Sequence, residues 1–215
     1  MSFCQRIGHG GASALAPANT LASFDAALEV GVDMVEFDVR AWRGDLVLAH
    51  TVLHAPRRAN VRLRDALAHL AGRRFAGIEV NLDVKGPGFE AALLAELRRW
   101  GLLERALVSS QMTSVVDRVR GLEPRVRVGV SVGGRLPRLT HRWGDWRAHV
   151  LAGLAARRWD AVMAQHRIVD QSLLEEVESR AGLLYAWTVN DRIALAGLRA
   201  LGVHGIATAD PRLFA

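Results

Sequence analysis

Two apolar segments of the sequence carry charged side chains two positions apart. Glu36 and Asp38 lie in one segment, and Asp83 and Lys85 lie in the other. Side chains two apart on a strand project from the same face, so each pair points to one side of its sheet. Oxygen ligands suit hard cations such as Mg²⁺ or Ca²⁺, whereas zinc prefers sulfur and imidazole nitrogen. We therefore expect Glu36, Asp38 and Asp83 to hold a divalent cation, Mg²⁺ or Ca²⁺.

Two histidines accompany these carboxylates. His9 stands in a glycine-rich turn at residues 8–11, and His50 follows the apolar run 46–49. Imidazole titrates near neutral pH, so two histidines beside a cation are suited to general acid and general base catalysis. The lone Cys4 excludes a metal site built from cysteines. His9 and His50 are therefore the candidate catalytic residues.

These motifs stand in an order that resembles one known family, the glycerophosphodiester phosphodiesterases. The family's opening reads His-Arg-Gly-Ala-Ser and then Pro-Glu-Asn-Thr-Leu, and this chain has His-Gly-Gly-Ala-Ser and Pro-Ala-Asn-Thr-Leu. The resemblance covers nearly the whole chain. The matching segments are residues 9–13, 17–21, 31–39, 50, 83–85, 187–190 and 205–208.

The resemblance implies an enzyme, a metal-dependent phosphoric diester hydrolase. It implies hydrolysis of glycerophosphodiesters to glycerol 3-phosphate and an alcohol, with His9 and His50 as the acid and base and a small-molecule substrate. We assign His9 as the base and His50 as the acid. The resemblance also implies that Lys85 and Trp187 bind the substrate, Lys85 through its phosphate.

Four positions depart from the family's pattern. Gly10 stands where the family usually has an arginine that contacts the phosphate, Ala18 where it has glutamate, and Thr51 where an aspartate follows the histidine. Asp83 replaces the more common glutamate. Losing one charge-assisted phosphate bond weakens transition-state binding by about 1.5 to 3 kcal/mol, unless a residue such as Lys85 or Arg40 substitutes.

These departures leave alternatives open beside the active glycerophosphodiesterase. One is a member of the same barrel family that acts on a lysophospholipid. Another is a non-catalytic barrel that binds a phosphorylated ligand through its cation. Retention of both His9 and His50 argues for catalysis, because a binding module needs only the carboxylates and the cation.

The elements that position these residues follow from the rhythm of the sequence. Strand-like runs alternate with amphipathic stretches, which predicts a parallel sheet with helices outside it. Eight strands joined by seven crossovers predict an α/β fold, a closed TIM (β/α)8 barrel, with chemistry at the carboxyl ends of its strands. The predicted strands are 4–8, 34–39, 78–85, 106–109, 126–132, 160–164, 183–188 and 205–208. The predicted helices are 20–30, 63–71, 88–100, 113–121, 146–157, 171–181 and 191–201.

One further strand-like run, 46–50, follows Asp38 too closely for an intervening helix. We expect it to fold back as an extra β-hairpin strand after the second barrel strand, which brings His50 beside the metal ligands. Asn19 is the predicted N-cap of the first helix. A typical barrel of this kind has about 250 residues, with about 200 near the lower limit, so the 215 residues predict one domain, 1–215, with short loops.

The formal charge of +6 raises the question of nucleic-acid binding. The basic residues are scattered and no reader motif accompanies them, so we expect no nucleic-acid partner. We interpret the densest basic stretch as a solvated loop followed by the start of a helix, rather than as a contact for lipid or nucleic acid. It contains Arg135, Arg138, Arg142 and Arg147, with Trp143 and Trp146 between them.

The sequence was examined for signals that would direct the protein to a cellular location. Only a few residues precede the first strand, which leaves no room for a signal peptide, and no run of about 18 apolar residues marks an integral membrane segment. A single cysteine is compatible with a reducing compartment. We expect a cytoplasmic protein, and the sequence leaves its oligomeric state open.

Overall fold

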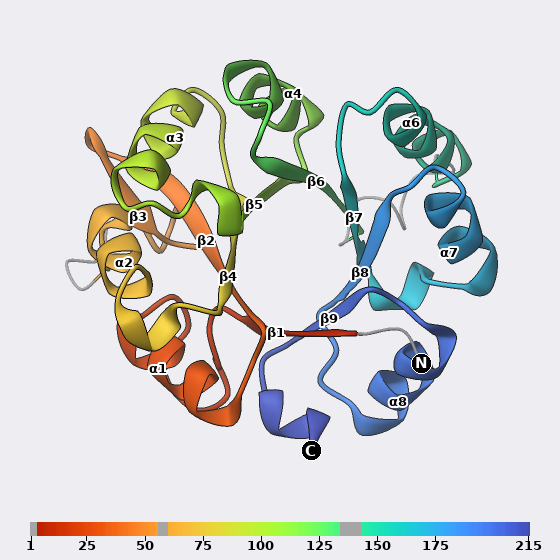
Figure 1. The fold of residues 1–215 in the computed structure, drawn as a ribbon, viewed down its shortest axis with the longest axis horizontal. Coiled ribbons are helices and arrows are strands. Elements are labelled where there is room, and N and C mark those ends of the chain that lie inside the picture. Colours follow the sequence, from red (N-terminus) through yellow and green to blue (C-terminus); the bar gives the residue numbers. More distant parts are fainter. Residues whose placement is uncertain (1–3, 56–59, 134–142) are drawn as a thin grey trace.

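The fold is a closed parallel barrel with its helices outside it (Figure 1). The computed structural model describes residues 4–55, 60–133 and 143–215. Strand β1 pairs in parallel with both β2 and β9, which closes the sheet on itself. The predicted TIM (β/α)8 barrel is confirmed.

The strands and helices alternate along the chain as the sequence predicts. The barrel strands are β1 (Gln5–His9), β2 (Met34–Trp42), β4 (Glu79–Val84), β5 (Ala106–Ser110), β6 (Arg127–Val132), β7 (Ala161–Gln165), β8 (Leu183–Trp187) and β9 (Gly205–Thr208). The helices are α1 (Leu21–Val30), α2 (Leu63–Leu70), α3 (Glu90–Arg99), α4 (Thr113–Leu122), α6 (Trp143–Ala155), α7 (Gln171–Glu178) and α8 (Arg192–Leu201). Short 3₁₀ turns are η1 (Arg73–Phe75), η2 (Leu103–Arg105), η3 (His166–Ile168) and η4 (Pro211–Phe214).

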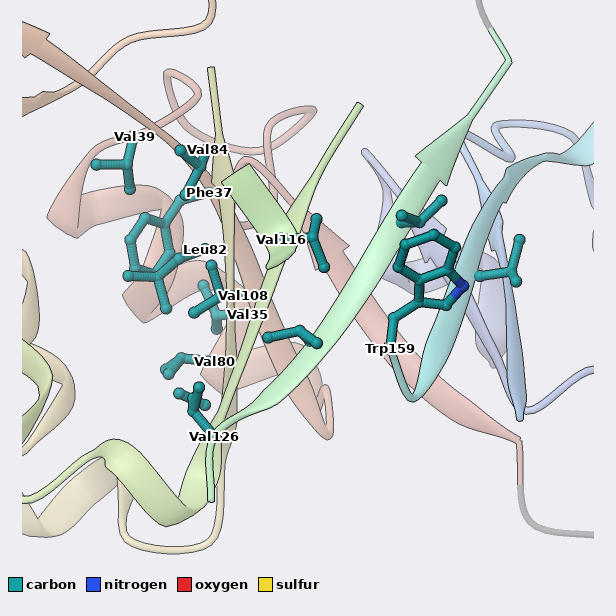
Figure 2. Close-up of a cluster of buried hydrophobic side chains, with 14 of the residues drawn as sticks. Val35, Phe37, Val39, Val80, Leu82, Val84, Val108, Val116, Val126 and Trp159 are labelled. Carbon is teal, nitrogen blue, oxygen red and sulfur yellow. The ribbon is translucent and has the colours of Figure 1, made fainter. Parts of the chain in front are cut away.

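The main core lies between the barrel wall and the surrounding helices. Phe37, Leu82 and Val84 project from neighbouring strands onto the same outer face of the sheet (Figure 2). The ring of Phe37 lies 5.3 Å from that of Phe24 on α1. Burying such side chains stabilises the fold by about 1.5 to 3 kcal/mol each, so the helices hold the barrel in shape. This packing fixes the strand ends that carry the site.

The extra strand β3 (Asp45–Leu48) confirms the predicted hairpin. It pairs antiparallel with the end of β2, with Val39 opposite Leu48. Arg43 and Gly44 at the turn have φ angles of 50° and 84°, as a tight two-residue hairpin turn requires. The Ala49 N–H then donates to the Asp38 carbonyl at 3.2 Å. His50 therefore follows directly beside the strand that carries the carboxylates.

The prediction that Asn19 caps the first helix is wrong. Thr20 is the N-cap of α1, because its hydroxyl accepts from the Ser23 N–H and the Ser23 hydroxyl accepts from the Thr20 N–H, each at 3.2 Å. Asn19 lies outside the helix in the left-handed region, with φ of 62°. Its side chain turns toward Asp38 instead.

Part of the basic stretch lies outside the described residues, namely Arg135, Arg138 and Arg142. Arg147 on α6 forms an ion pair of 2.7 Å with Glu176 on α7, so this cation serves helix packing. In residues 4–55, 60–133 and 143–215 no helix is both long enough and apolar enough to span a membrane.

Candidate active site

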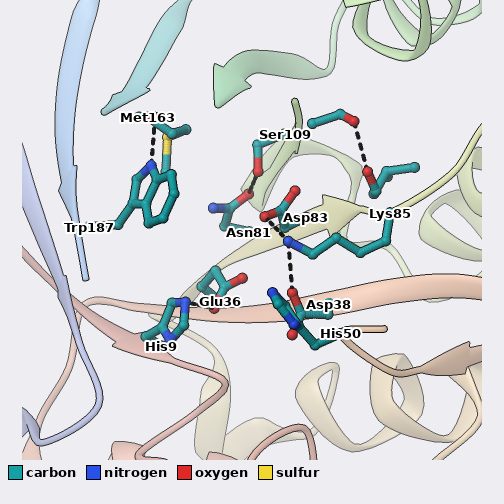
Figure 3. Close-up of polar contacts among 12 residues, drawn as sticks. His9, Glu36, Asp38, His50, Asn81, Asp83, Lys85, Ser109, Met163 and Trp187 are labelled. Atoms are coloured by element: carbon teal, nitrogen blue, oxygen red, sulfur yellow. Dashed lines mark hydrogen bonds and ion pairs between the residues drawn. The ribbon is translucent and has the colours of Figure 1, made fainter. Parts of the chain in front are cut away.

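A pocket opens at the carboxyl ends of the barrel strands and gathers the residues that the sequence singles out. It holds about 450 Å³ of space, counting solvent at its mouth. All the predicted site residues except Asp38 line it, and Asp38 lies directly behind, bonded to Lys85 (Figure 3). The lining residues are His9, Glu36, His50, Asn81, Asp83, Lys85, Ser109, Gln111, Ser131, Met163, Trp187 and Ala207.

Three carboxylates converge at one side of this pocket. Glu36 and Asp38 project from the same face of β2, and Asp83 on β4 is the register partner of Asp38. One oxygen from each lies within 4.8 Å of the others. Among the residues that the structure describes, the Oδ1 atom of Asp83 is buried without a hydrogen-bond partner, which is costly unless a cation binds there. Oxygen donors in this arrangement fit Mg²⁺ or Ca²⁺.

Lys85 is the counter-charge within the carboxylate group. Its Nζ lies 2.5 Å from Asp83 Oδ2 and 3.0 Å from Asp38 Oδ1. Burial alone would lower the pKa of Lys85, but the neighbouring carboxylates, Asp83 first, raise it above its ordinary value. Lys85 is therefore charged at neutral pH.

The same environment shifts the pKa values of the three carboxyl groups in different directions. Burial, together with the charges of Asp38 and Asp83, raises the pKa of Glu36 well above its usual range. Burial also acts to raise the pKa of Asp38, but Lys85 and a hydrogen bond from Asn19 lower it overall. Burial raises the pKa of Asp83 despite Lys85. A divalent cation would offset this repulsion.

The two histidines reach the pocket from different elements. His9 ends β1, with its Nε2 3.9 Å from Glu36 Oε2 and 3.3 Å from the Thr188 hydroxyl. Burial lowers the pKa of His9, so its ring is neutral at pH 7 and can accept a proton. His50 is exposed, and its backbone carbonyl accepts a bond of 3.2 Å from Arg40 Nη2. A half-buried imidazole and an exposed imidazole thus flank the acidic group.

Asn19 contacts the candidate site, although the sequence analysis gave it a different role. Its Nδ2 donates to Asp38 Oδ2 at 2.8 Å, and its Oδ1 accepts from the Asp38 N–H at 2.9 Å. This pair of bonds fixes both the backbone and the carboxylate of Asp38. Asn19 lies in the segment 17–21 that carries the family resemblance, and this was the sequence signal that could have pointed to its place beside the pocket.

The other lining residues missed from the sequence are uncharged. Trp187 on β8, which was predicted, has its indole N–H donating to the Met163 carbonyl at 2.6 Å. The strands β4, β5 and β6 contribute Asn81, Ser109 and Ser131, with Asn81 in register with Glu36. The position of Asn81, two before Asp83 on the same strand, was a signal that alternation could have revealed.

Two departures from the family's pattern are in contact with each other. Gly10 has φ of 61°, and a Cβ atom there would lie 3.1 Å from the Cβ of Ala18. The Gly10 N–H donates to Glu36 Oε2 at 2.9 Å. The backbone at this position thus supports one of the three converging carboxylates, although no arginine side chain is present.

The remaining histidines of the described residues have other surroundings. None of His54, His69, His149, His166 and His204 lines the pocket, and His141 lies outside the described residues. His69 bonds to Asp25 at 3.0 Å, and the Nδ1 of His204 accepts from the Leu184 N–H at 3.1 Å.

A parallel barrel with an acidic group and two histidines at its strand ends has the features of a metal-assisted hydrolase. The glycerophosphoryl diester phosphodiesterase family matches residues 9–51 and 78–213, most of the chain. The chain belongs to this family of phosphoric diester hydrolases. The resemblance seen in the sequence and the expectation of an enzyme are thereby confirmed.

Relatives match over nearly the full length. A glycerophosphodiester phosphodiesterase of Caldanaerobacter subterraneus subsp. tengcongensis is 25% identical, with 95% of this chain and 93% of the relative covered. A phosphodiesterase structure from Oleispira antarctica, in complex with the product sn-glycerol-3-phosphate, has a TM-score of 0.77 at 21% identity, covering 97% of this chain and 94% of that one. A glycerophosphodiester phosphodiesterase structure from Agrobacterium tumefaciens has a TM-score of 0.77 at 18% identity and covers 99% of each chain. The two structures support the fold.

Proposed function

We propose that the protein is a metal-dependent phosphodiesterase that hydrolyses small glycerophosphodiesters to glycerol 3-phosphate and an alcohol. The observation that carries this proposal is the convergence of Glu36, Asp38 and Asp83 with His9 and His50 around one pocket. The Oleispira antarctica structure, whose bound product is sn-glycerol-3-phosphate, supports this substrate class.

Glu36, Asp38 and Asp83 would hold the cation, Mg²⁺ or Ca²⁺. When bound, a cation of this kind polarises a phosphoryl oxygen and neutralises charge that grows in the transition state. Asn19 and the Gly10 N–H hold two of its ligands in place. The protein therefore prepares the site with hydrogen bonds behind the carboxylates.

His9 and His50 share the proton transfers in this proposal. His9, neutral because partial burial lowers its pKa, takes the proton of the attacking hydroxyl, which belongs to water or to the substrate's own glycerol. A new P–O bond forms while the P–O bond to the alcohol breaks. His50, exposed at the mouth, gives a proton to the departing alcohol. Attack by the glycerol hydroxyl gives a cyclic phosphate first, which water then opens with the roles reversed: His50 takes a proton from water and His9 returns its proton to the glycerol oxygen.

Lys85 contacts the phosphate in this scheme. An ammonium group has three donors, and the carboxylates of Asp83 and Asp38 engage two of them. The third donor is available to a phosphate oxygen. Trp187 on the opposite wall packs against the substrate.

A second candidate substrate is a lysophospholipid. Two apolar side chains lie just beyond His50 and are left in solvent, Val52 at 60% and Leu53 at 82% exposure. They offer contact to a hydrocarbon chain that leaves the pocket on the His50 side. Glycerophosphocholine and lysophosphatidylcholine should therefore be assayed in parallel.

The test of the proposal is product release by histidine variants. We expect His9→Ala and His50→Ala each to lower glycerol 3-phosphate release by about 10²- to 10⁴-fold, because each removes one proton transfer. His69→Ala is the matched control, since His69 lies outside the pocket and bonds to Asp25. Unchanged release in both site variants would overturn the two-histidine mechanism. Binding of phosphorylated ligands without any turnover would favour the non-catalytic alternative.

A further inference from the structure

Three uncharged polar side chains stand inside the barrel where apolar residues are expected. Asn81 on β4 and Ser109 on β5 are each 1% exposed, and Ser131 on β6 is 4% exposed. The interiors of such barrels are usually filled by Val, Ile and Leu. All three side chains line the pocket, on three strands that neighbour one another in the barrel.

The hydrogen bonds within this group leave donors facing the pocket. Ser109 Oγ donates to Asn81 Oδ1 at 2.9 Å, which fixes the orientation of the Asn81 amide. Within the described part of the chain, neither the Asn81 Nδ2 nor the Ser131 Oγ has a protein hydrogen-bond partner. A ligand that fills the pocket without bonding to these two groups leaves them unpaired, which is costly, so a ligand that does bond to them is preferred.

Asn81 lies deeper in the barrel than Asp83. Asn81 precedes Asp83 by two residues on β4, which is about 6.6 Å closer to the amino end of the strand. Its register partner is Glu36, whereas the partner of Asp83 is Asp38. His50, by contrast, is exposed. A substrate therefore has an inner end near Asn81 and an outer end near His50.

The chemistry of the group selects a neutral hydroxyl as its ligand. A hydroxyl both donates and accepts, as Ser131 does, and it accepts from the Asn81 amide. A phosphate would be repelled by the nearby carboxylates of Glu36 and Asp83. A quaternary ammonium has no N–H to share with Ser131 and no oxygen for Asn81.

We propose that Asn81 and Ser131 form a subsite for the glycerol hydroxyls of the substrate, with Ser109 as the residue that positions Asn81. The proposal rests on the proposed function and deepens it. The glycerol end enters first and the leaving alcohol faces the mouth. His9 is then beside the glycerol and His50 beside the leaving group, which agrees with their roles as base and acid.

Binding measurements test this subsite without requiring turnover. Isothermal titration of the Mg²⁺- or Ca²⁺-loaded protein compares sn-glycerol 3-phosphate with propyl phosphate, which lacks both hydroxyls. We expect the wild type to prefer glycerol 3-phosphate. Ser131→Ala and Asn81→Ala should each weaken glycerol 3-phosphate binding by about threefold to tenfold and leave propyl phosphate unchanged.

Ser110→Ala is the matched control. Ser110 is equally buried, but its hydroxyl donates to the Val84 carbonyl at 2.7 Å and does not line the pocket. This variant should bind both ligands with the wild-type ratio, and thermal unfolding of all variants checks that they fold. A wild type without preference for glycerol 3-phosphate, or variants that keep the preference, would overturn the subsite. If the preference is present and lost as expected but no diester is hydrolysed, the subsite stands and the proposed activity fails.

Discussion

The two halves of the pocket differ in how their polar groups are paired. In the half built by β1, β2 and β4, each charged side chain is held by another group, as Asp38 is by Lys85 and Asn19. In the half built by β5 to β9, the Ser131 hydroxyl faces the pocket with no hydrogen-bond partner among the described residues, and Met163 and Trp187 supply apolar surface. The charged half is organised before any ligand arrives, as chemistry requires, whereas the uncharged half keeps its bonding capacity for a ligand.

This difference predicts that changes in the charged half have the larger effects. Replacing Glu36 and Asp38 together, as Glu36→Gln/Asp38→Asn, removes two of the three proposed cation ligands. We expect loss of metal-dependent activity by at least about a hundredfold. We also expect loss of the stabilisation that a bound cation gives the wild type, about 2.7 kcal/mol at one hundred times its Kd.

Thermal unfolding with and without Mg²⁺ or Ca²⁺ measures the second effect independently of turnover. The matched control is the single variant Glu175→Gln on the remote helix α7, which should keep the cation-dependent shift. An equal shift in the double variant and the wild type would mean that the cation binds elsewhere.

Lys85→Met tests whether the charged half depends on its internal counter-charge. The change leaves Asp38 and Asp83 buried without their ammonium partner, and breaking such a pair costs about 3 to 5 kcal/mol. We expect the free energy of unfolding without added metal to fall by that order, and added cation to restore part of it. Denaturant titration measures both values. A stability unchanged by Lys85→Met would show that the ion pairs contribute nothing.

Asn19→Ala tests whether Asn19 supports the carboxylate of Asp38, a role distinct from the capping of α1 by Thr20. It removes two hydrogen bonds to Asp38, and such supporting changes lower metal affinity by about 10- to 100-fold. Thr20→Ala, one residue further, removes the helix cap and lowers stability by about 1 kcal/mol. Calorimetric metal titration should show the loss of affinity for Asn19→Ala alone. Equal affinities in the two variants would contradict the assignment of Asn19 to the site.

Asp33→Asn tests whether losing a charged pair at the opposite end of the barrel, far from the pocket, affects activity. Asp33 accepts from the Nε and Nη2 of Arg6 at 3.0 and 2.8 Å. Burial acts to raise the pKa of Asp33, but the bonds from Arg6 lower it below its ordinary value of 3.8.

A depressed carboxyl pKa contributes stability that is present above about pH 4 and is lost as the pH falls through the folded pKa. We therefore expect Asp33→Asn to cost less than about 1 kcal/mol at pH 7, and the difference from the wild type to vanish at lower pH. Activity should be unchanged. A loss of activity equal to that of Lys85→Met would mean that the two ends of the barrel do not differ as argued.

The same comparison explains what the sequence predicts well. Carboxylates such as Glu36 and Asp38 are conspicuous in an apolar strand, because burial of unpaired charge is costly and needs a reason. Strand alternation then assigns them to one face. The barrel and its hairpin follow from the rhythm of apolar runs, since the interval after Asp38 is too short for a helix.

The uncharged half is less visible from sequence. Ser131 and Ser109 are ordinary in a strand, and only the closed barrel brings them to the wall opposite His9. Asparagine is a common N-cap residue, so the sequence favours that role for Asn19. Its positive φ and its hydrogen bonds to Asp38 depend instead on packing against β2. The contact between Gly10 and Ala18 likewise joins segments whose approach the sequence leaves unspecified.

The most direct test of the account is glycerol 3-phosphate release from glycerophosphocholine by the wild-type protein in Mg²⁺, in Ca²⁺ and in EDTA. The account predicts release that requires one of the two cations and that falls in His9→Ala and His50→Ala. Equal release in EDTA would contradict the role given to Glu36, Asp38 and Asp83. Absence of release from glycerophosphocholine and from lysophosphatidylcholine, with the cation bound, would contradict the proposed activity itself.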